Sequence, residues 1–136
     1  MSIEENKAII RRWIEGINEQ TIKDELLSED YVYHAGDQEV KGAQTFKQIA
    51  SATFFPVFPD VNYTIDDMVA EGDKVAIRCT MTATHMGEFM GVAPTGKRIT
   101  LTEAIFYRLA GGKIMEALQY VDQLSMMQQL GVMPKQ

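Results

Sequence analysis

The chain has 136 residues, with 13 Lys or Arg against 19 Asp or Glu, which gives a formal net charge of −6 at pH 7. This length is typical of one domain, so residues 1–136 are expected to form a single unit. The net negative charge and the absence of a cluster of Lys and Arg residues argue against a nucleic-acid partner. No apolar run approaches the ~18 residues that a membrane-spanning helix needs, so no membrane association is expected.

The N-terminal segment and the cysteine content predict a cytoplasmic location. Residues 1–10 open with acids and lack the basic and apolar regions of a signal peptide. Cys79 is the single cysteine, so no internal disulfide can form, which is typical of a reducing compartment. The histidines and the cysteine show no metal-ligand spacing, and no cofactor-binding motif is present, so the sequence predicts neither a metal nor a cofactor.

Helical periodicity marks the start of the chain. Ser2 and Glu5 have the spacing of a capping box. Apolar residues then recur at helical spacing and predict an amphipathic helix that ends near residues 16–19: Ile10, Trp13, Ile14 and Ile17.

Shorter elements follow in the first half of the chain. The patterns predict, in chain order, a short helix over 21–27, a strand over 31–34, a turn at Gly36-Asp37 before residues 39–40, and an amphipathic helix over 46–54. The prolines within residues 55–60 end this helix, because proline disfavours helix at the residue before it.

From Tyr63 to Val121 the pattern changes to long strands joined by short turns. Residues 71–74 and 110–113 are hairpin signals. The glycine-rich link from His85 to Lys97 predicts a mobile flap between two strands.

A last helix is predicted over residues 122–130, and Gly131 is a natural residue to end it. Helices first and an antiparallel meander afterwards predict an α+β fold.

Strand alternation predicts which face of the sheet is buried. Apolar residues take every second position of two strands: Val75, Ile77, Cys79, Met81 and Ala83, then Ile99, Leu101, Ile105, Tyr107 and Leu109. Threonine and arginine predominate at the alternate positions. The helices are therefore expected to cover the apolar face, while the threonine-rich face points outward.

Titratable residues that interrupt an apolar row are candidate functional residues, because burying a charge is costly unless it is paired or functional. Glu103 interrupts the row between Leu101 and Ile105, and His85 continues the other row at the start of the flap. A second interpretation makes Glu103 a buried partner of an Arg or Tyr side chain, and His85 a structural residue.

Four further residues have both a functional and a structural interpretation. His34 shares a strand face with Val32 and is either a site residue or a structural one. Asp122 lies where the last strand meets the last helix and is either an acid/base group or the cap of that helix. Trp13 and Met90 are either apolar contacts for a ligand or packing residues.

Several segments of the chain together resemble a known family. They are Thr84-His85-Met86-Gly87-Glu88-Phe89-Met90-Gly91-Val92-Ala93-Pro94-Thr95-Gly96-Lys97, Gly112-Lys113-Ile114-Met115-Glu116, Asp122 and Gln129-Leu130-Gly131. The pattern resembles the SnoaL-like polyketide cyclase (ester cyclase) family, from the first helix to Gly131. The resemblance implies the nuclear transport factor 2-like fold, a cone of helices packed on a strongly curved antiparallel sheet, with a pocket inside.

The resemblance also implies a reaction. Known cyclases of the family close a ring by intramolecular aldol condensation, with an Asp as general acid/base and without a metal or organic cofactor. The match places this role on Asp122. In this cyclase hypothesis His34 is the second catalytic residue, a hydrogen-bond partner in the pocket, and the expected contacts of a small apolar carbonyl compound are Glu103, His85, Trp13 and Met90.

We therefore predict that His34, His85, Glu103 and Asp122 open onto one common cavity. Two other classes of function stay open: an isomerase, dehydratase or hydrolase on the same fold, and a non-catalytic binder of a small apolar molecule.

The outward face of the sheet predicts a homodimer. Small residues and one aromatic residue make a flat surface of low charge there: Thr80, Thr82, Thr84, Thr100, Thr102, Ala104 and Phe106. Arg78, Arg98 and Arg108 are expected at its rim. The alternative is a solvated sheet face.

Overall fold

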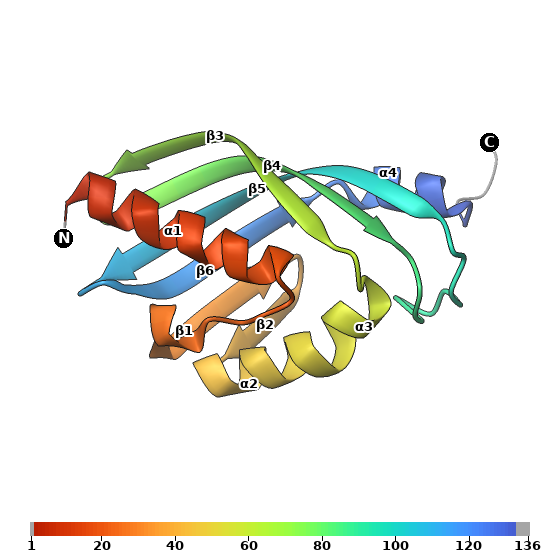
Figure 1. Cartoon of the computed structure of the whole chain (residues 1–136), viewed down its shortest axis with the longest axis horizontal. Helices are drawn as coiled ribbons and strands as arrows, with labels where there is room; N and C mark the ends of the chain where they lie inside the picture. The colour runs from red at the N-terminus through yellow and green to blue at the C-terminus, as the bar shows by residue number, and fades with distance from the viewer. Residues whose placement is uncertain (1, 133–136) are drawn as a thin grey trace.

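The computed structural model describes residues 2–132, which form a curved six-stranded sheet with α1, α2 and α3 on one side (Figure 1). In chain order the elements are α1 (Ile3–Asn18), η1 (Asp24–Leu26), β1 (Leu27–Ala35), β2 (Gln38–Lys41), α2 (Ala43–Ile49), η2 (Ala50–Phe54), α3 (Phe55–Val57), β3 (Asn62–Glu71), β4 (Lys74–Thr84), β5 (Arg98–Ala110), β6 (Lys113–Val121) and α4 (Gln123–Leu130). Within this part of the chain, no helix has the length and apolarity needed to cross a membrane.

The strand order is β2-β1-β6-β5-β4-β3. β1 runs parallel to β6, and every other neighbouring pair is antiparallel. The meander from β3 to β6 confirms the hairpin turns predicted at residues 71–74 and 110–113. The β1–β2 hairpin joins the free edge of β6, and the predicted α+β class is confirmed.

Helix α1 begins at the predicted capping box. The Glu5 amide donates to Ser2 Oγ at 3.1 Å, and the Ser2 amide donates to Glu5 Oε1 at 3.3 Å. Its buried face packs against β3 and β4 and comprises Asn6, Ile9, Ile10, Trp13, Ile14 and Gly16. At its end, the Asn18 carboxamide bonds both the amide and the carbonyl of Tyr63, which fixes α1 to β3.

Two element predictions differ from the structure. The helix expected over residues 21–27 is only the three-residue η1, and β1 already begins at Leu27, which pairs with Ile114 of β6. This pairing with a distant strand overrides the local helical preference. The helix expected over 46–54 starts at Ala43 and continues through the π-helical η2 into α3.

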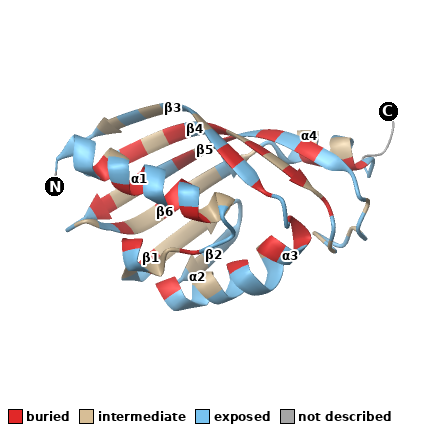
Figure 2. Ribbon diagram, viewed as in Figure 1, coloured by how far each residue is buried: buried red, intermediate tan, exposed pale blue. Residues whose placement is uncertain are grey.

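The buried rows of β4 and β5 confirm the predicted alternation. Every second residue of both strands is buried, and the residues between them are half-buried or exposed. Figure 2 shows buried residues of α1 facing these strands. The core therefore lies between the helices and one face of the sheet (the inner face), and the threonine-rich outer face has no helix α1–α3 on it.

Helix α4 follows β6 and ends as predicted at Gly131. Gly131 has φ of 77°, a left-handed conformation that glycine adopts without steric cost. The Lys97 ammonium donates to the Leu130 carbonyl at 3.3 Å, so the end of the flap is tied to the end of α4.

Candidate functional site

A polar cluster lies on the inner face of the sheet, within the apolar core. It comprises Glu103 of β5, Gln119 of β6, Tyr33 of β1 and Tyr63 of β3, and we call it the Glu103 cluster. Glu103 is 3% exposed. Gln119 donates through Nε2 to Glu103 Oε1, and the Tyr33 hydroxyl donates to Gln119 Oε1. Three strands therefore contribute to one hydrogen-bonded chain.

The Glu103 carboxyl has an altered acidity. Burial raises the pKa of Glu103 to about 7, and hydrogen bonds from Gln119 and Tyr63 lower it by less. None of the ion pairs within residues 2–132 involves Glu103. A carboxyl with a pKa near neutrality can both accept and return a proton, which is the property a general acid/base needs.

The other titratable groups near Glu103 stay protonated. Burial, followed by the charge of Glu103, raises the pKa of both Tyr33 and Tyr63 well above the usual value for tyrosine. Burial also raises the pKa of the Cys79 thiol to about 12. Since a thiol is a nucleophile only as the thiolate, Cys79 is an inert core residue.

Aromatic rings fill the interior beside the Glu103 cluster. Trp13, predicted to contact ligand or to pack, is buried and lies 6.4 Å from the Tyr31 ring and 6.0 Å from the Phe46 ring. Phe46 also contacts Tyr33, at 5.1 Å between ring centroids. Tyr33 and Phe46 are half-buried, so the cluster approaches solvent at this side.

Asp122 is the N-cap residue of α4, as one of its two sequence interpretations predicts. Its Oδ1 accepts from the Ser125 amide at 2.9 Å, and its side chain is exposed. The preceding residue, Val121, is the partner of Glu103 across β5 and β6. The two carboxyl-bearing residues are therefore near neighbours along the sheet, but Asp122 is turned toward the helix amide.

His34 lies on the outer face. It is in register with Leu118, which pairs with the exposed Phe106, whereas Tyr33 is in register with the buried Ala117. This places His34 on the opposite side of the sheet from the Glu103 cluster.

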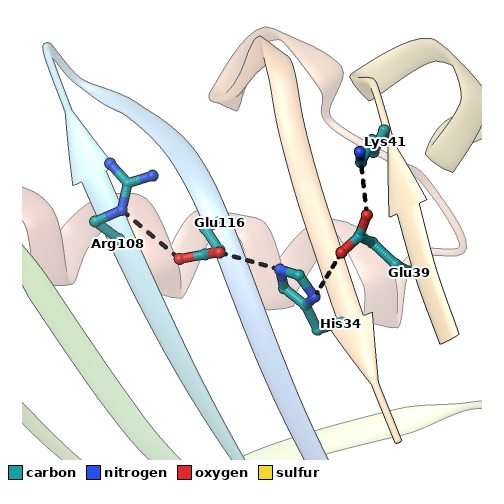
Figure 3. A network of polar contacts seen from close by, with 5 residues as sticks. All are labelled: His34, Glu39, Lys41, Arg108 and Glu116. Atoms are coloured by element: carbon teal, nitrogen blue, oxygen red, sulfur yellow. Dashed lines mark hydrogen bonds and ion pairs between the residues drawn. The ribbon is translucent and has the colours of Figure 1, made fainter. Parts of the chain in front are cut away.

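A chain of charged residues on the outer face holds His34, as Figure 3 shows. His34 Nε2 lies 3.0 Å from Glu116 Oε2, and His34 Nδ1 lies 3.5 Å from Glu39 Oε2. Arg108 and Lys41 extend the chain at 3.7 Å from Glu116 and 3.4 Å from Glu39. This row of side-chain contacts crosses four strands, from β5 to the edge strand β2.

His85 joins the two ends of the flap. Its amide donates to the Lys97 carbonyl, its carbonyl accepts from the Gly96 amide, and its Nδ1 accepts from the Thr95 amide at 3.2 Å. The ring is fully buried, and its Nε2 has no hydrogen-bond partner within residues 2–132. These contacts agree with the structural interpretation of His85.

The flap rests on α3. The Met86 amide donates to the Val57 carbonyl, and a Cβ on Gly87 would lie 3.1 Å from Val57 Cα, so glycine allows this close approach. Phe89 contacts Phe58 at 5.3 Å between ring centroids. Met90, predicted as a substrate contact, is exposed at the tip of the flap.

The prediction that four titratable residues open onto one cavity is wrong. His34 and Glu103 lie on opposite faces of the sheet. Cys79 is the partner of Glu103 on β4, and His85 lies six residues beyond Cys79. At about 3.3 Å per residue this is about 20 Å along the strand. The sequence therefore predicted the inward position of Glu103 and, in its second interpretation, a tyrosine partner, but not the contact with Gln119.

Three residues of the Glu103 cluster were missed. Gln119 stands between Ala117 and Val121, so it interrupts an apolar row in the same way as Glu103. Tyr33 shares its strand face with Tyr31, which is buried, but Val32 makes the opposite face of this short strand apolar as well. All three are uncharged at neutral pH, so none of them stands out as a charge within an apolar row.

Two hollows lie at the surface, away from the cluster. One, of about 320 Å³, is at Asp24 and the start of α2, and the other, of about 440 Å³, is at Arg11 and the β3 residues 65–68. Within the described part of the chain, no group of three or more His, Cys, Asp or Glu residues could hold a metal ion.

Comparisons with known proteins identify the family. The model of the SnoaL-like polyketide cyclase family matches residues 7–130. The structure is similar to AclR from Streptomyces galilaeus, described as "a putative hydroxylase", with 31% identity, a TM-score of 0.85, and 98% of this chain and 100% of that one covered. It is also similar to IdmH from Streptomyces antibioticus, described as "a putative polyketide cyclase", with 32% identity, a TM-score of 0.75, and 93% and 99% covered.

A more distant structure supports the fold alone. An NTF2-like protein from Cytophaga hutchinsonii has 14% identity and a TM-score of 0.68, with 90% of this chain and 94% of that one covered. This agrees with the predicted nuclear transport factor 2-like fold. No curated protein matches the chain. With the family model matched over residues 7–130 and two relatives above 30% identity, the chain belongs to the SnoaL-like polyketide cyclase family.

Proposed function

We propose that the protein catalyses cofactor-independent acid/base chemistry on a small apolar carbonyl compound, with Glu103 as the group that takes and returns the proton. Family membership favours intramolecular aldol-type ring closure within this class of reactions. The observation that carries the proposal is the buried carboxyl of Glu103, which has no cation partner within residues 2–132 and a pKa raised to about 7.

The chemistry follows from this acidity. Ring closure by aldol condensation requires a base that removes a proton from the carbon beside a carbonyl, and then an acid that protonates the new alkoxide. One carboxyl with a pKa near 7 can perform both steps in turn, and such help contributes typically ~10²–10⁴-fold in rate. The proposal includes movement of the half-buried Tyr33 and Phe46 when a ligand enters, since aromatic rings occupy the interior.

The first step can be tested without the natural substrate. Proton removal beside a carbonyl is measured as deuterium incorporation from heavy water into a panel of small ketones and 1,3-diketones, followed by NMR. We expect the wild-type protein to accelerate exchange for at least one of them. We expect Glu103→Gln to lower that rate by about 10²-fold or more, because the amide cannot accept the proton.

The matched control is Glu71→Gln, which makes the same chemical change at an exposed hairpin position. It should exchange at the wild-type rate. Full exchange activity in Glu103→Gln would reject the assigned role. A wild-type protein that binds members of the panel without accelerating exchange would favour the non-catalytic binder.

Asp122 is the second acid/base candidate, since the family resemblance places the role there. Asp122→Asn separates its two interpretations, because asparagine is an equally good N-cap residue but cannot take up a proton. If Glu103 is the acid/base group, Asp122→Asn retains exchange activity. A loss confined to Asp122→Asn would transfer the role to Asp122.

A further inference from the structure

A series of hydrogen bonds connects the hydroxyl of Tyr33, a half-buried residue, to the carboxyl of the buried Glu103. Tyr33 donates to Gln119 Oε1, and Gln119 donates through Nε2 to Glu103 Oε1. The three side chains come from β1, β6 and β5. Gln119 therefore connects the half-buried Tyr33 to the buried Glu103.

The direction of donation along this chain depends on the charge of Glu103. An ionised carboxylate has only acceptor atoms, so Gln119 must present its NH₂ group to Glu103 and its carbonyl to Tyr33. The Tyr33 hydroxyl then donates its hydrogen bond to Gln119 and is not available to a ligand. A protonated Glu103 can donate to the Gln119 carbonyl after the carboxamide turns over, and the NH₂ group then faces the Tyr33 oxygen. In that state the Tyr33 hydroxyl keeps its proton and can donate a hydrogen bond to a ligand.

We propose that Tyr33 is the hydrogen-bond donor that the site presents to a ligand oxygen, and that Gln119 frees this donor when Glu103 becomes protonated. This inference rests on the proposed function of Glu103 as the proton acceptor. It assigns two roles that the acid/base proposal lacks: Tyr33 contacts the ligand, and Gln119 is a positioning residue.

The coupling links proton removal to oxyanion stabilisation, because the protonation of Glu103 makes the Tyr33 hydroxyl available as a donor. When the C–H bond beside the carbonyl breaks, its proton goes to the Glu103 carboxylate and its electron pair moves to the carbonyl oxygen, which becomes an enolate. Protonation of Glu103 reverses the Gln119 carboxamide, and the Tyr33 hydroxyl then donates to the enolate oxygen. Return of the proton from Glu103 restores the starting arrangement, so no further reactant is needed.

Tyr33 is suited to donate without losing its proton. Burial, followed by the charge of Glu103, raises the pKa of its hydroxyl well above the usual value for tyrosine. It therefore stays protonated and acts as a neutral donor rather than as a second base. The ligand class that fits is a compound whose reacting C–H carbon lies beside a carbonyl group, with no requirement for a charged group.

The coupling can be measured in the protein without any ligand. Tyrosine is isotope-labelled at the ring carbon that bears the hydroxyl, glutamate at the side-chain carboxyl carbon, and both are followed by NMR as pH is varied. Tyr33→Phe and Glu103→Gln assign the two signals. We expect the Tyr33 signal to shift with the same midpoint as the Glu103 carboxyl, and the exposed Tyr120 signal to stay constant through that midpoint.

Gln119→Leu tests the connection itself. In this variant Glu103 should still titrate, while the shift of the Tyr33 signal through that titration should be clearly smaller, since only the direct effect of the Glu103 charge on Tyr33 remains. A Tyr33 signal that is constant through the Glu103 titration in the wild type, or that shifts as far in Gln119→Leu as in the wild type, overturns the coupling. The wild-type titration decides the question even if Gln119→Leu does not fold.

Tyr33→Phe tests the ligand contact. Removal of one donor to a developing oxyanion costs about 10²–10³-fold in rate, so exchange into the ketone panel should fall by about 10²-fold while Glu103 titrates as before. Exchange at the wild-type rate would overturn the role of Tyr33. Because the titration uses no substrate, failure of the coupling is distinguishable from failure of the proposed catalytic function.

Discussion

The Gln129 side chain completes the hydrogen bonding of the Thr100 backbone. Gln129 Oε1 accepts from the Thr100 amide at 2.8 Å, and Gln129 Nε2 donates to the Thr100 carbonyl at 2.8 Å. The pairing of β5 with β6 ends at Glu103 and Val121, so Thr100 lies beyond the last pair of the two strands. The carboxamide takes the place of a neighbouring strand there and fixes α4 to β5.

Gln129→Ala should therefore destabilise the protein. The variant loses two hydrogen bonds to backbone groups, which together contribute about 1–3 kcal/mol to the free energy of unfolding. Urea denaturation measures the difference. Gln128→Ala is the matched control, since Gln128 is exposed in the same helix, and it should change stability by less than about 0.5 kcal/mol. Equal effects of the two variants would contradict the strand-like role of Gln129.

The acidity of Glu103 predicts a pH dependence of stability. Its folded pKa is raised from 4.5 to about 7, so the folded state binds this proton more tightly than the unfolded state. The contribution of this carboxyl to stability is therefore fully present below about pH 4.5 and is lost as pH rises through about 7. The difference across this window is of the order of 3 kcal/mol.

Glu103→Gln should remove this dependence. Relative to the wild type, its free energy of unfolding should rise across the window and exceed the wild-type value above pH 7, because no charge is buried in the variant. Urea denaturation across the window measures it, with Glu71→Gln as the exposed control. A constant difference between Glu103→Gln and wild type at every pH would show that Glu103 titrates normally in the folded state.

The cap at Asp122 predicts opposite results for two substitutions. Asp122→Ala removes the acceptor of the Ser125 amide and should cost about 0.5–2 kcal/mol of stability. Asp122→Asn keeps an acceptor at the same place and should cost little. Thermal denaturation compares the two, and a similar loss in both would contradict the capping role.

The flap should exchange its amide hydrogens faster than the strands it joins. Between residues 87 and 94 the backbone hydrogen bonds are those that Phe89 and Val92 make with each other, whereas β4 and β5 form a continuous ladder. Hydrogen exchange read by mass spectrometry is the measurement. Protection of residues 87–94 equal to that of β4 would contradict a mobile flap.

The outer face of the sheet is the surface through which we expect a homodimer. Phe106 and Tyr120 are 51% and 58% exposed there, and their rings contact each other edge to face at 6.1 Å. The same face carries both signs of charge, with Arg108 beside Glu116. A two-fold related copy can therefore place its Glu116 near Arg108 of this one while the aromatic residues are covered.

Sedimentation at micromolar protein concentration tests this interface. The wild type should be a dimer, and the double variant Thr82→Arg, Thr102→Glu should be a monomer, because it buries charge at the centre of the face. Arg12→Glu, on the exposed side of α1, is the control and should stay dimeric. A monomeric wild type, or a double variant that remains dimeric, would reject the interface.

The sequence predicted those features that depend on neighbouring residues. Alternation in β4 and β5 is continuous over many residues, so the inward position of Glu103 followed from its own strand. The capping box at Ser2 and the end of α4 at Gly131 are likewise local. Each rests on hydrogen bonds or backbone conformations within a few residues.

The sequence did not predict features that depend on pairing between distant strands. Both faces of residues 31–34 contain apolar side chains, so His34 and Tyr33 could not be assigned to a face from that segment. Their assignment is decided by β6, more than 80 residues later, through the contacts of Tyr33 with Gln119 and of His34 with Glu116. The site could not be assembled for the same reason, since its members come from four strands.

The central position of β6 has a consequence for how the chain folds during synthesis. The β1–β2 hairpin and the β3–β5 meander are made first, but neither touches the other within the sheet until β6 is inserted between β1 and β5. Until then the sheet is in two pieces, and each has an open edge that can pair with another chain. Closure of the sheet is thus a late, long-range event, which makes folding slow compared with that of a purely local meander.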